Sequence, residues 1–146
     1  MNQDLQALAE SNCRKALRTI DLVAASLGDY RAFDPAVTYT PKALEPYDAL
    51  SDRFVRAVEC ALRYFRSREL AEFAEQSDTT RTLLNRMEKL GLVSSANLWL
   101  AMRNVRNRIV HDYLPEQVAQ MFDEISGGYG DELMRLGEKL RRPADR

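Results

Sequence analysis

The residues best suited to chemistry lie in one short stretch, 106–113, which reads RNRIVHDY and contains the only histidine of the 146-residue chain. Histidine is the side chain whose ordinary pKa lets it both accept and donate a proton near neutral pH. Arginine is a permanent, forked cation that matches the oxygens of a phosphate group. The presence of His111 five positions after Arg106 therefore predicts chemistry on a phosphodiester.

RNA would supply its own nucleophile for such a reaction, the 2′-hydroxyl group. His111 would act as a general base toward that hydroxyl or as a general acid toward the leaving oxygen. Arg106 would stabilise the negative charge that develops on the phosphoryl oxygens. Asn107 shares a helical face with His111 and would orient the imidazole or hydrogen-bond the phosphate. We expect no metal and no cofactor, because the chain has a single histidine, no CxxC pair and no DxD-type carboxylate group.

Arg106 and His111 do not form a tight pair on one helix, since five residues turn an ideal helix by about 140° beyond a full turn. The length of the arginine side chain, fraying of the helix end, or a second copy of the helix could bring both to one phosphate. A second copy would also double the positive charge, and two-fold dimers are the commonest oligomers. We therefore expect a homodimer with the motif helix at its two-fold interface, and with Arg103 and Arg106 supplying charge.

Apolar residues recur at helical spacing in five segments, and no strand-like alternation competes with them. The segments are 2–27, from between 43 and 48 to about 75, 79–90, from 94 or 95 to between 111 and 113, and 115 to about 141. Asp78 is expected to cap the third segment, and Trp99 to anchor the core from the fourth. Three glycines at 127, 128 and 130 predict a kink in the last segment. The sequence thus predicts an all-α, antiparallel four- to five-helix bundle, with one domain over 1–141 and a frayed tail at 142–146.

The composition, 45% hydrophobic and 29% charged, is that of a globular domain, and the net charge is −1. Any RNA binding must therefore come from a local basic patch or from an assembly. Cys13 and Cys60 are expected to be reduced and buried, which together with the lack of a signal peptide or membrane span favours a cytoplasmic protein. Two features have an open role: the 30–42 loop, and a face formed by Arg53, Arg56 and Arg63.

The motif resembles the signature of the HEPN superfamily and, within it, of the HepT-like toxins. That signature is an arginine, usually a polar residue, three further positions, a histidine, any residue and a tyrosine. Arg106, Asn107, His111 and Tyr113 occupy these positions without a departure. The segment 99–105 and the helical layout from about residue 44 onward are also similar to the family, whereas the first helix and the 30–42 loop match only in type.

The resemblance implies a HEPN-like bundle that acts as a dimeric, metal-independent endoribonuclease toxin on RNA, in some cases on tRNA. It makes Arg106 and His111 the catalytic pair, and we assign Asn107, Arg103 and Asp112 to supporting roles. It also implies a minimal nucleotidyltransferase antitoxin that transfers AMP to Tyr113. The added phosphate would pair with nearby arginines and fill the cleft meant for RNA.

Two other interpretations remain open from the sequence. In one, the same dimer is a non-catalytic partner or substrate-binding subunit of a nucleotidyltransferase, and the motif contacts AMP. The near-neutral net charge of the chain favours this interpretation, because RNA binding depends on basic residues. In the other, the chain is a helical scaffold, and His111 only complements the dipole at a helix end, which is worth about 0.3–1 kcal/mol.

Overall fold

A computed structural model describes residues 2–142, and every regular element in that range is a helix, so the predicted all-α class is confirmed. Most of the predicted tail, 143–146, lies outside the described residues. The elements are α1 (Gln3–Gly28), α2 (Pro41–Phe73), α3 (Thr80–Lys89), α4 (Ala96–His111), α5 (Pro115–Glu124), the π-helical turn η1 (Ile125–Tyr129) and α6 (Gly130–Arg141). None of these helices is long and apolar enough to cross a membrane.

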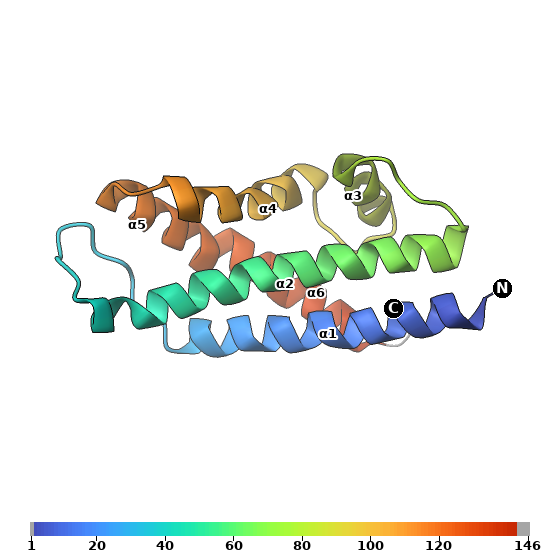
Figure 1. Ribbon diagram of the computed structural model, residues 1–146, viewed down its shortest axis with the longest axis horizontal. Coiled ribbons are helices and arrows are strands. Elements are labelled where there is room, and N and C mark those ends of the chain that lie inside the picture. The colour runs from blue at the N-terminus through green and yellow to red at the C-terminus, as the bar shows by residue number, and fades with distance from the viewer. Residues whose placement is uncertain (1, 143–146) are drawn as a thin grey trace.

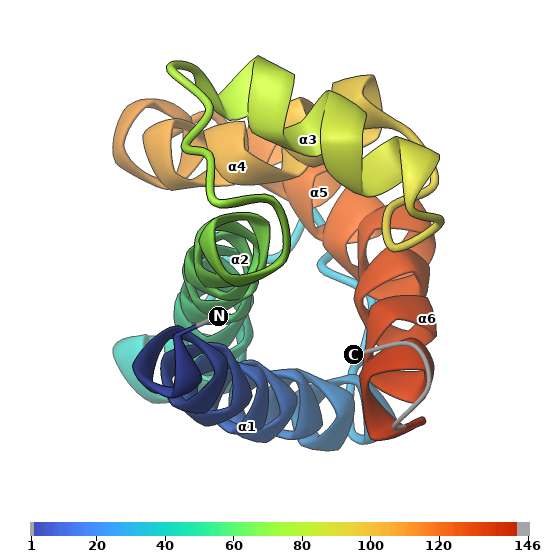
Figure 2. The same ribbon diagram turned by 90° about the vertical axis from the view of Figure 1, so that its right-hand side faces the viewer.

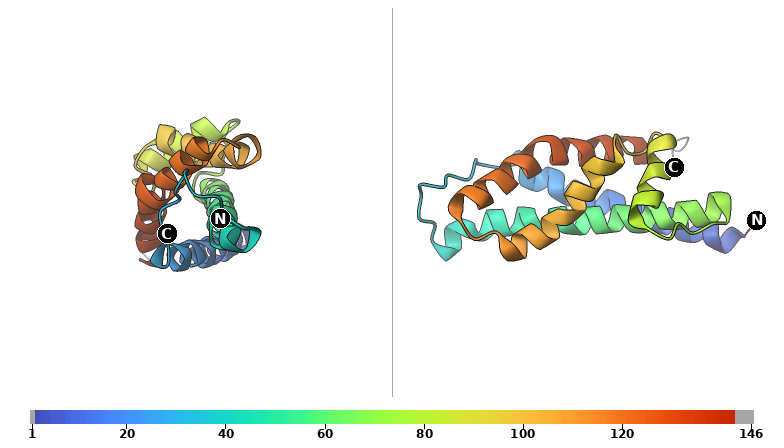
Figure 3. Two further views of the ribbon diagram at one scale, coloured as in Figure 1. Left: turned by 90° about the vertical axis from the view of Figure 1, so that its left-hand side faces the viewer. Right: turned by 90° about the horizontal axis from the view of Figure 1, so that it is seen from above.

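The two long helices α1 and α2 run antiparallel and side by side, and they form the base of the bundle (Figure 1). Helix α6 packs on α1, while α3 and α4 pack on each other and on α2. Viewed along the long axis, α1, α2, α4 and α6 surround a common core (Figure 2). Seen from above, α4 crosses α2 obliquely, so only part of α4 is in a position to be buried (Figure 3).

Helix α4 is anchored at its start by Trp99, which is fully buried as predicted. Its ring packs edge-on against Phe65 of α2, with ring centroids 5.3 Å apart. Its indole Nε1 donates to Oε2 of Glu132 on α6 at 2.7 Å. The same carboxylate accepts hydrogen bonds from the backbone N–H (2.8 Å) and the hydroxyl (2.6 Å) of Ser94. One buried carboxylate of α6 therefore holds the residues that lead into α4.

The helix ends differ from the predicted ones where local side chains decide them. Helix α2 begins at Pro41, earlier than predicted, because Thr40 accepts a hydrogen bond from the N–H of Ala43 and proline suits a first helical turn. Thr79, rather than Asp78, caps α3. In α1, Leu8 and Ala24 fit the predicted apolar repeat, but both are exposed, so the prediction is wrong at these two positions.

The predicted kink in the last segment is confirmed. Gly127 in η1 has φ −102° and ψ −119°, which is not helical, and the chain then resumes as α6. A side chain at Gly130 would meet the carbonyl oxygen of Ile125 at 2.5 Å and Leu27 of α1 at 3.1 Å. The missing side chain at Gly130 thus lets the end of η1 approach α1.

We predict that Glu132→Gln lowers the free energy of unfolding by about 1–3 kcal/mol, because the new amide group turns one acceptor into a donor facing Trp99 or Ser94. Urea unfolding followed by the fluorescence of the single tryptophan measures this loss. Glu138→Gln, an exposed change on the same helix, is the matched control. Equal stability of Glu132→Gln and wild type would mean that this carboxylate does not hold α4.

Candidate functional site

The predicted motif covers the last six residues of α4, 106–111, and the two residues that follow the helix. The buried side of α4 consists of Ala96, Trp99, Met102 and Val105. The predicted apolar repeat was expected to continue, but Ile109 is 39% exposed and Val110 is 76% exposed. The last part of α4 therefore leaves the core, and it carries the motif out to the surface.

Three of the predicted site residues, Arg103, Arg106 and Asn107, line one groove of about 460 Å³. Asn104 and Leu100 of α4 complete that side, and Glu59 of α2 forms the other. Two guanidinium groups face one carboxylate, so the groove carries a net positive charge and suits an anion.

The groove has weak internal contacts. Nη1 of Arg106 lies 4.0 Å from Oε1 of Glu59, and both side chains are largely exposed to water, at 70% and 41%. An exposed pair at this distance contributes at most about 1 kcal/mol, so an incoming phosphate can replace Glu59 at Arg106 at small cost. Asn107 donates from Nδ2 to Oδ1 of Asn104 at 2.9 Å, so within one chain it does not orient His111, which was one of its two expected roles.

His111 and Tyr113 are not among the residues that line this groove. His111 is the last residue of α4 and is exposed, and its imidazole makes no hydrogen bond to any residue of the described range 2–142. Tyr113 is 83% exposed. Within one chain the structure therefore brings Arg103, Arg106 and Asn107 together but leaves His111 and Tyr113 apart from them.

Asp112 is held by a network that the sequence did not reveal. Nε of Arg108 donates to Oδ2 of Asp112 at 3.3 Å, and Nη1 of Arg108 donates to the carboxylate of Glu124 on α5. Glu124 also accepts from Nε2 of Gln120 at 2.9 Å. Partial burial works against the ionised form of Glu124, but the hydrogen bonds from Gln120 and Arg108 prevail and lower its pKa. Arg108 thus links Asp112, the residue after His111, to the neighbouring helix α5.

The 30–42 loop borders the end of the motif. A second groove, of about 360 Å³, lies between loop residues that include Phe33 and Tyr39 and motif residues that include Ile109 and Tyr113. The loop is held by aromatic contacts: Phe33 stacks on Tyr39 with centroids 4.7 Å apart, and on Phe122 of α5 at 5.8 Å. The loop lacks the periodic apolar pattern of a helix, and the aromatic residues in its sequence are the feature that indicates an ordered conformation.

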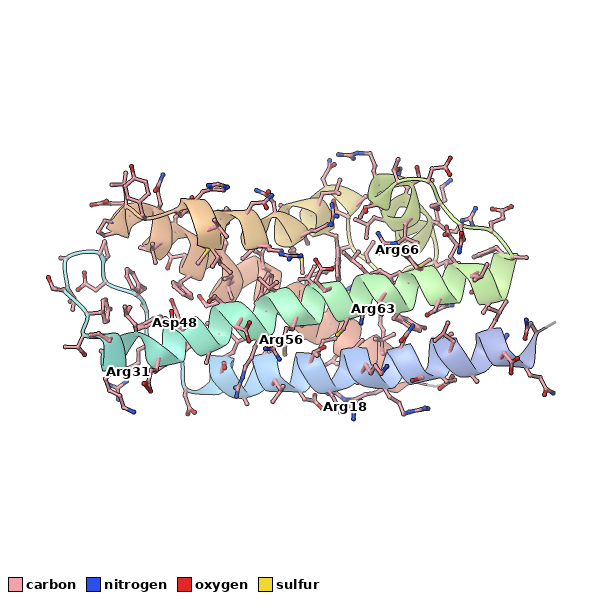
Figure 4. The ribbon with its side chains drawn as sticks, viewed as in Figure 1. Arg18, Arg31, Asp48, Arg56, Arg63 and Arg66 are labelled. Atoms are coloured by element: carbon pink, nitrogen blue, oxygen red, sulfur yellow. The ribbon has the colours of Figure 1, made fainter. Side chains whose placement is uncertain are left out.

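The predicted arginine face on α2 does not act as one surface. Arg53 is half-buried and bonds to α1, whereas Arg56 forms an exposed ion pair with Asp52 at 3.1 Å and Arg63 is exposed. Figure 4 shows Arg56 and Arg63 along α2. Glu59 lies between Arg56 and Arg63 in sequence, and its side chain faces α4 at Arg106. The sequence of α2 alone does not predict this contact.

Within residues 2–142 there is no group of three or more histidine, cysteine or carboxylate side chains that could hold a metal ion. Neither Cys13 nor Cys60 forms a disulfide in the described part of the chain; Cys13 is buried as expected, but Cys60 is only partly buried. Comparison with known proteins gives no matching family model, no matching curated protein and no matching solved structure.

We predict that Glu124→Gln destabilises the protein by about 1 kcal/mol at neutral pH, because it removes the charged acceptor of Arg108. The pKa of Glu124 is lowered by folding, so its contribution is fully present above the pKa of an unfolded glutamate, about 4.3, and is lost as the pH falls through the lower folded-state value. The difference in unfolding free energy between wild type and variant should therefore shrink in acid. Asp123→Asn, its exposed neighbour, is the control, and a difference that does not change with pH would contradict the assignment.

Proposed function

We propose that the protein is a metal-independent endoribonuclease that acts as a homodimer, with Arg106 and His111 as the catalytic pair. The proposal rests on the motif and on its resemblance to the HepT-like toxins of the HEPN superfamily. The observation that best supports it is the exposure of the reactive side chains. Arg103 and Arg106 line a positively charged groove, and His111 stands free at the helix end. Exposure leaves both side chains accessible to a phosphate of RNA.

The proposed reaction is an attack of the 2′-hydroxyl oxygen on the adjacent phosphorus, with loss of the 5′ oxygen of the next nucleotide. His111 takes the proton of the 2′-hydroxyl or gives one to the leaving oxygen. Arg106, supported by Arg103, stabilises the extra negative charge on the non-bridging oxygens. Asn107 donates to the phosphate, because its amide lies at the same groove.

The proposed dimer uses the apolar surface that surrounds His111. Ile109, Val110, Tyr113 and Leu114 are all exposed and lie within six positions of the chain, and apolar side chains that gather on a surface can mark an interface with another protein. A second copy seated on these residues would cover them and bring its own His111 toward the groove. This arrangement meets the need set by the spacing, since Arg106 and His111 of one chain lie on different sides of α4.

The proposed partner is a minimal nucleotidyltransferase antitoxin that acts on Tyr113. The tyrosine oxygen would attack the α-phosphorus of ATP and release pyrophosphate, which leaves AMP on the side chain. The high exposure of Tyr113 supports this role, because a transferase must reach the hydroxyl. The alternative, a non-catalytic partner subunit of a nucleotidyltransferase, uses the same tyrosine but needs no cleavage of RNA.

We predict that the purified protein cleaves total tRNA in the presence of EDTA, and that Arg106→Ala and His111→Ala each reduce the rate by at least about 100-fold. Gel analysis of the cleaved RNA measures the rate. Arg18→Ala removes an exposed arginine from α1, away from the groove (Figure 4), and should cleave as wild type does. No cleavage by the unmodified dimeric protein would favour the partner-subunit alternative. Cleavage that survives in both motif variants would remove the motif from the mechanism.

We further predict that the two inactive variants complement each other when they are co-expressed. If each site combines Arg106 of one chain with His111 of the other, a mixed dimer has one intact site and one doubly inactive site. Random pairing makes half of the dimers mixed, so about a quarter of the wild-type activity should return. Separate tags and sequential affinity steps isolate the mixed dimer. A mixed dimer as inactive as its parents would show that each site uses residues of a single chain.

A further inference from the structure

A cavity of about 540 Å³ lies at the end of the bundle opposite the chain's N-terminus, between the end of α1, the loop after it and the first turns of α2. None of the motif residues lines it. Its walls combine two arginines, Arg31 and Arg53, with the rings of Tyr30 and Tyr47 and with small apolar side chains such as Ala25 and Ala49. Figure 4 shows Arg31 at this end of the molecule, beside the first turns of α2.

Arg53 is a fixed and unneutralised cation on the cavity wall. Its Nη1 donates to the carbonyl of Leu22 at 3.2 Å and to Oγ of Ser26 at 2.9 Å, so α1 sets the position of the guanidinium. Neither Arg53 nor Arg31 forms an ion pair with a carboxylate between residues 2 and 142, although Asp29 also lines the cavity. Two arginines against one aspartate leave a net positive charge at a site where one guanidinium is already oriented.

The aromatic wall offers a corner between two rings and a hydrogen-bond donor. Tyr30 and Tyr47 meet edge to face, with ring centroids 6.1 Å apart. The Tyr47 hydroxyl donates to the carbonyl of Arg31 at 2.8 Å, which ties the loop to α2. The Tyr30 hydroxyl accepts the N–H of Phe33 at 3.3 Å, and its own proton has no acceptor in the described part of the chain. An oxygen of a bound ligand would satisfy that proton.

The side chain of Tyr47 contributes an uncharged phenol to the cavity wall. Burial, and then the neighbouring Tyr39 hydroxyl, raise the pKa of Tyr47 to about 12. The phenol is thus uncharged at any physiological pH and does not repel an anion.

We propose that this cavity binds a small organic anion, namely a flat ring system that carries one sulfonate, carboxylate or phosphate group. The ring would lie in the corner between Tyr30 and Tyr47, against the face of one ring and the edge of the other. The anionic group would bind Arg53 and Arg31 and accept the proton of Tyr30. Guanidinium groups bind such oxygens through paired, charge-assisted hydrogen bonds. The proposal stands independently of the ribonuclease assignment, because the two sites share no residue.

The test uses 1-anilinonaphthalene-8-sulfonate, which joins an aromatic body to a single sulfonate and fluoresces when it leaves water. Titration of the wild-type protein should give saturable binding to one site. N-phenyl-1-naphthylamine has the same rings without the sulfonate, and it should bind about tenfold or more weakly, as expected for the loss of a charge-assisted hydrogen bond. Equal binding of the two compounds, or a signal that does not saturate, would overturn the proposal.

Variants locate the site. Arg53→Gln should weaken sulfonate binding about tenfold, whereas Arg63→Gln, which removes an exposed arginine from the same helix outside the cavity, should leave it unchanged. Ala25→Trp fills the mouth from an exposed position on α1 and should abolish binding without removing a charge. Thermal unfolding without the dye shows whether each variant is folded, and Arg31→Gln replaces Arg53→Gln if the latter is not. Wild-type affinity in Ala25→Trp would place the dye elsewhere and refute the assignment.

Discussion

The buried carboxylate of Glu132 is the contact on which the placement of α4 depends. It is 4% exposed, and it is held by three hydrogen bonds that reach across 38 residues of chain to Ser94 and across 33 to Trp99. Nη1 of Arg135 lies 3.6 Å from Oε1 of the same carboxylate. A buried carboxylate that accepts three hydrogen bonds is costly to disturb, because the loss of any of them leaves a buried polar group unpaired. These contacts fix the position of the first turn of α4 relative to α6. Because a helix is rigid, they also set the direction in which the rest of α4 runs.

The far end of α4 is held in a different way. Arg108 links Asp112 to Glu124, so the residue after His111 is tied to α5 through partly exposed side chains. Between these two anchors the helix turns its charged side chains to water. Both ends are thus restrained, and Met102 and Val105 between them are buried. The backbone of α4 therefore holds Arg103 and Arg106 in place, while their side chains stay exposed. An exposed arginine on a restrained helix loses less freedom when it binds an anion than one on a free loop would lose.

The sequence predicted the features that depend on local patterns and missed those that depend on contacts between distant segments. The helical class, the Trp99 anchor and the glycine kink follow from periodicity and from single residues, and the structure confirms them. The Thr40-Pro41 pair was assigned to the loop, although it is also the signature of a helix start. Ile109 and Val110 continue an apolar repeat that the core does not use, since burial depends on where neighbouring helices end. Glu59 and Glu124 belong to other helices, so no spacing within 106–113 points to them.

The spacing of Arg106 and His111 sets a constraint on any function built on both. Residues five apart on a helix point in directions that differ by about 140°, and the anchors at both ends of α4 keep the helix from unwinding to correct this. The charge of the chain also favours a site built from two copies. One groove holds two arginines and one glutamate, in a chain whose net charge is −1. A polyanion binds such a chain weakly, whereas two grooves on one assembly act on the same strand together. Under the proposed function, the exposed apolar residues around His111 form the dimer interface. That interface completes the site, because it places the groove and the histidine of the second copy beside those of the first.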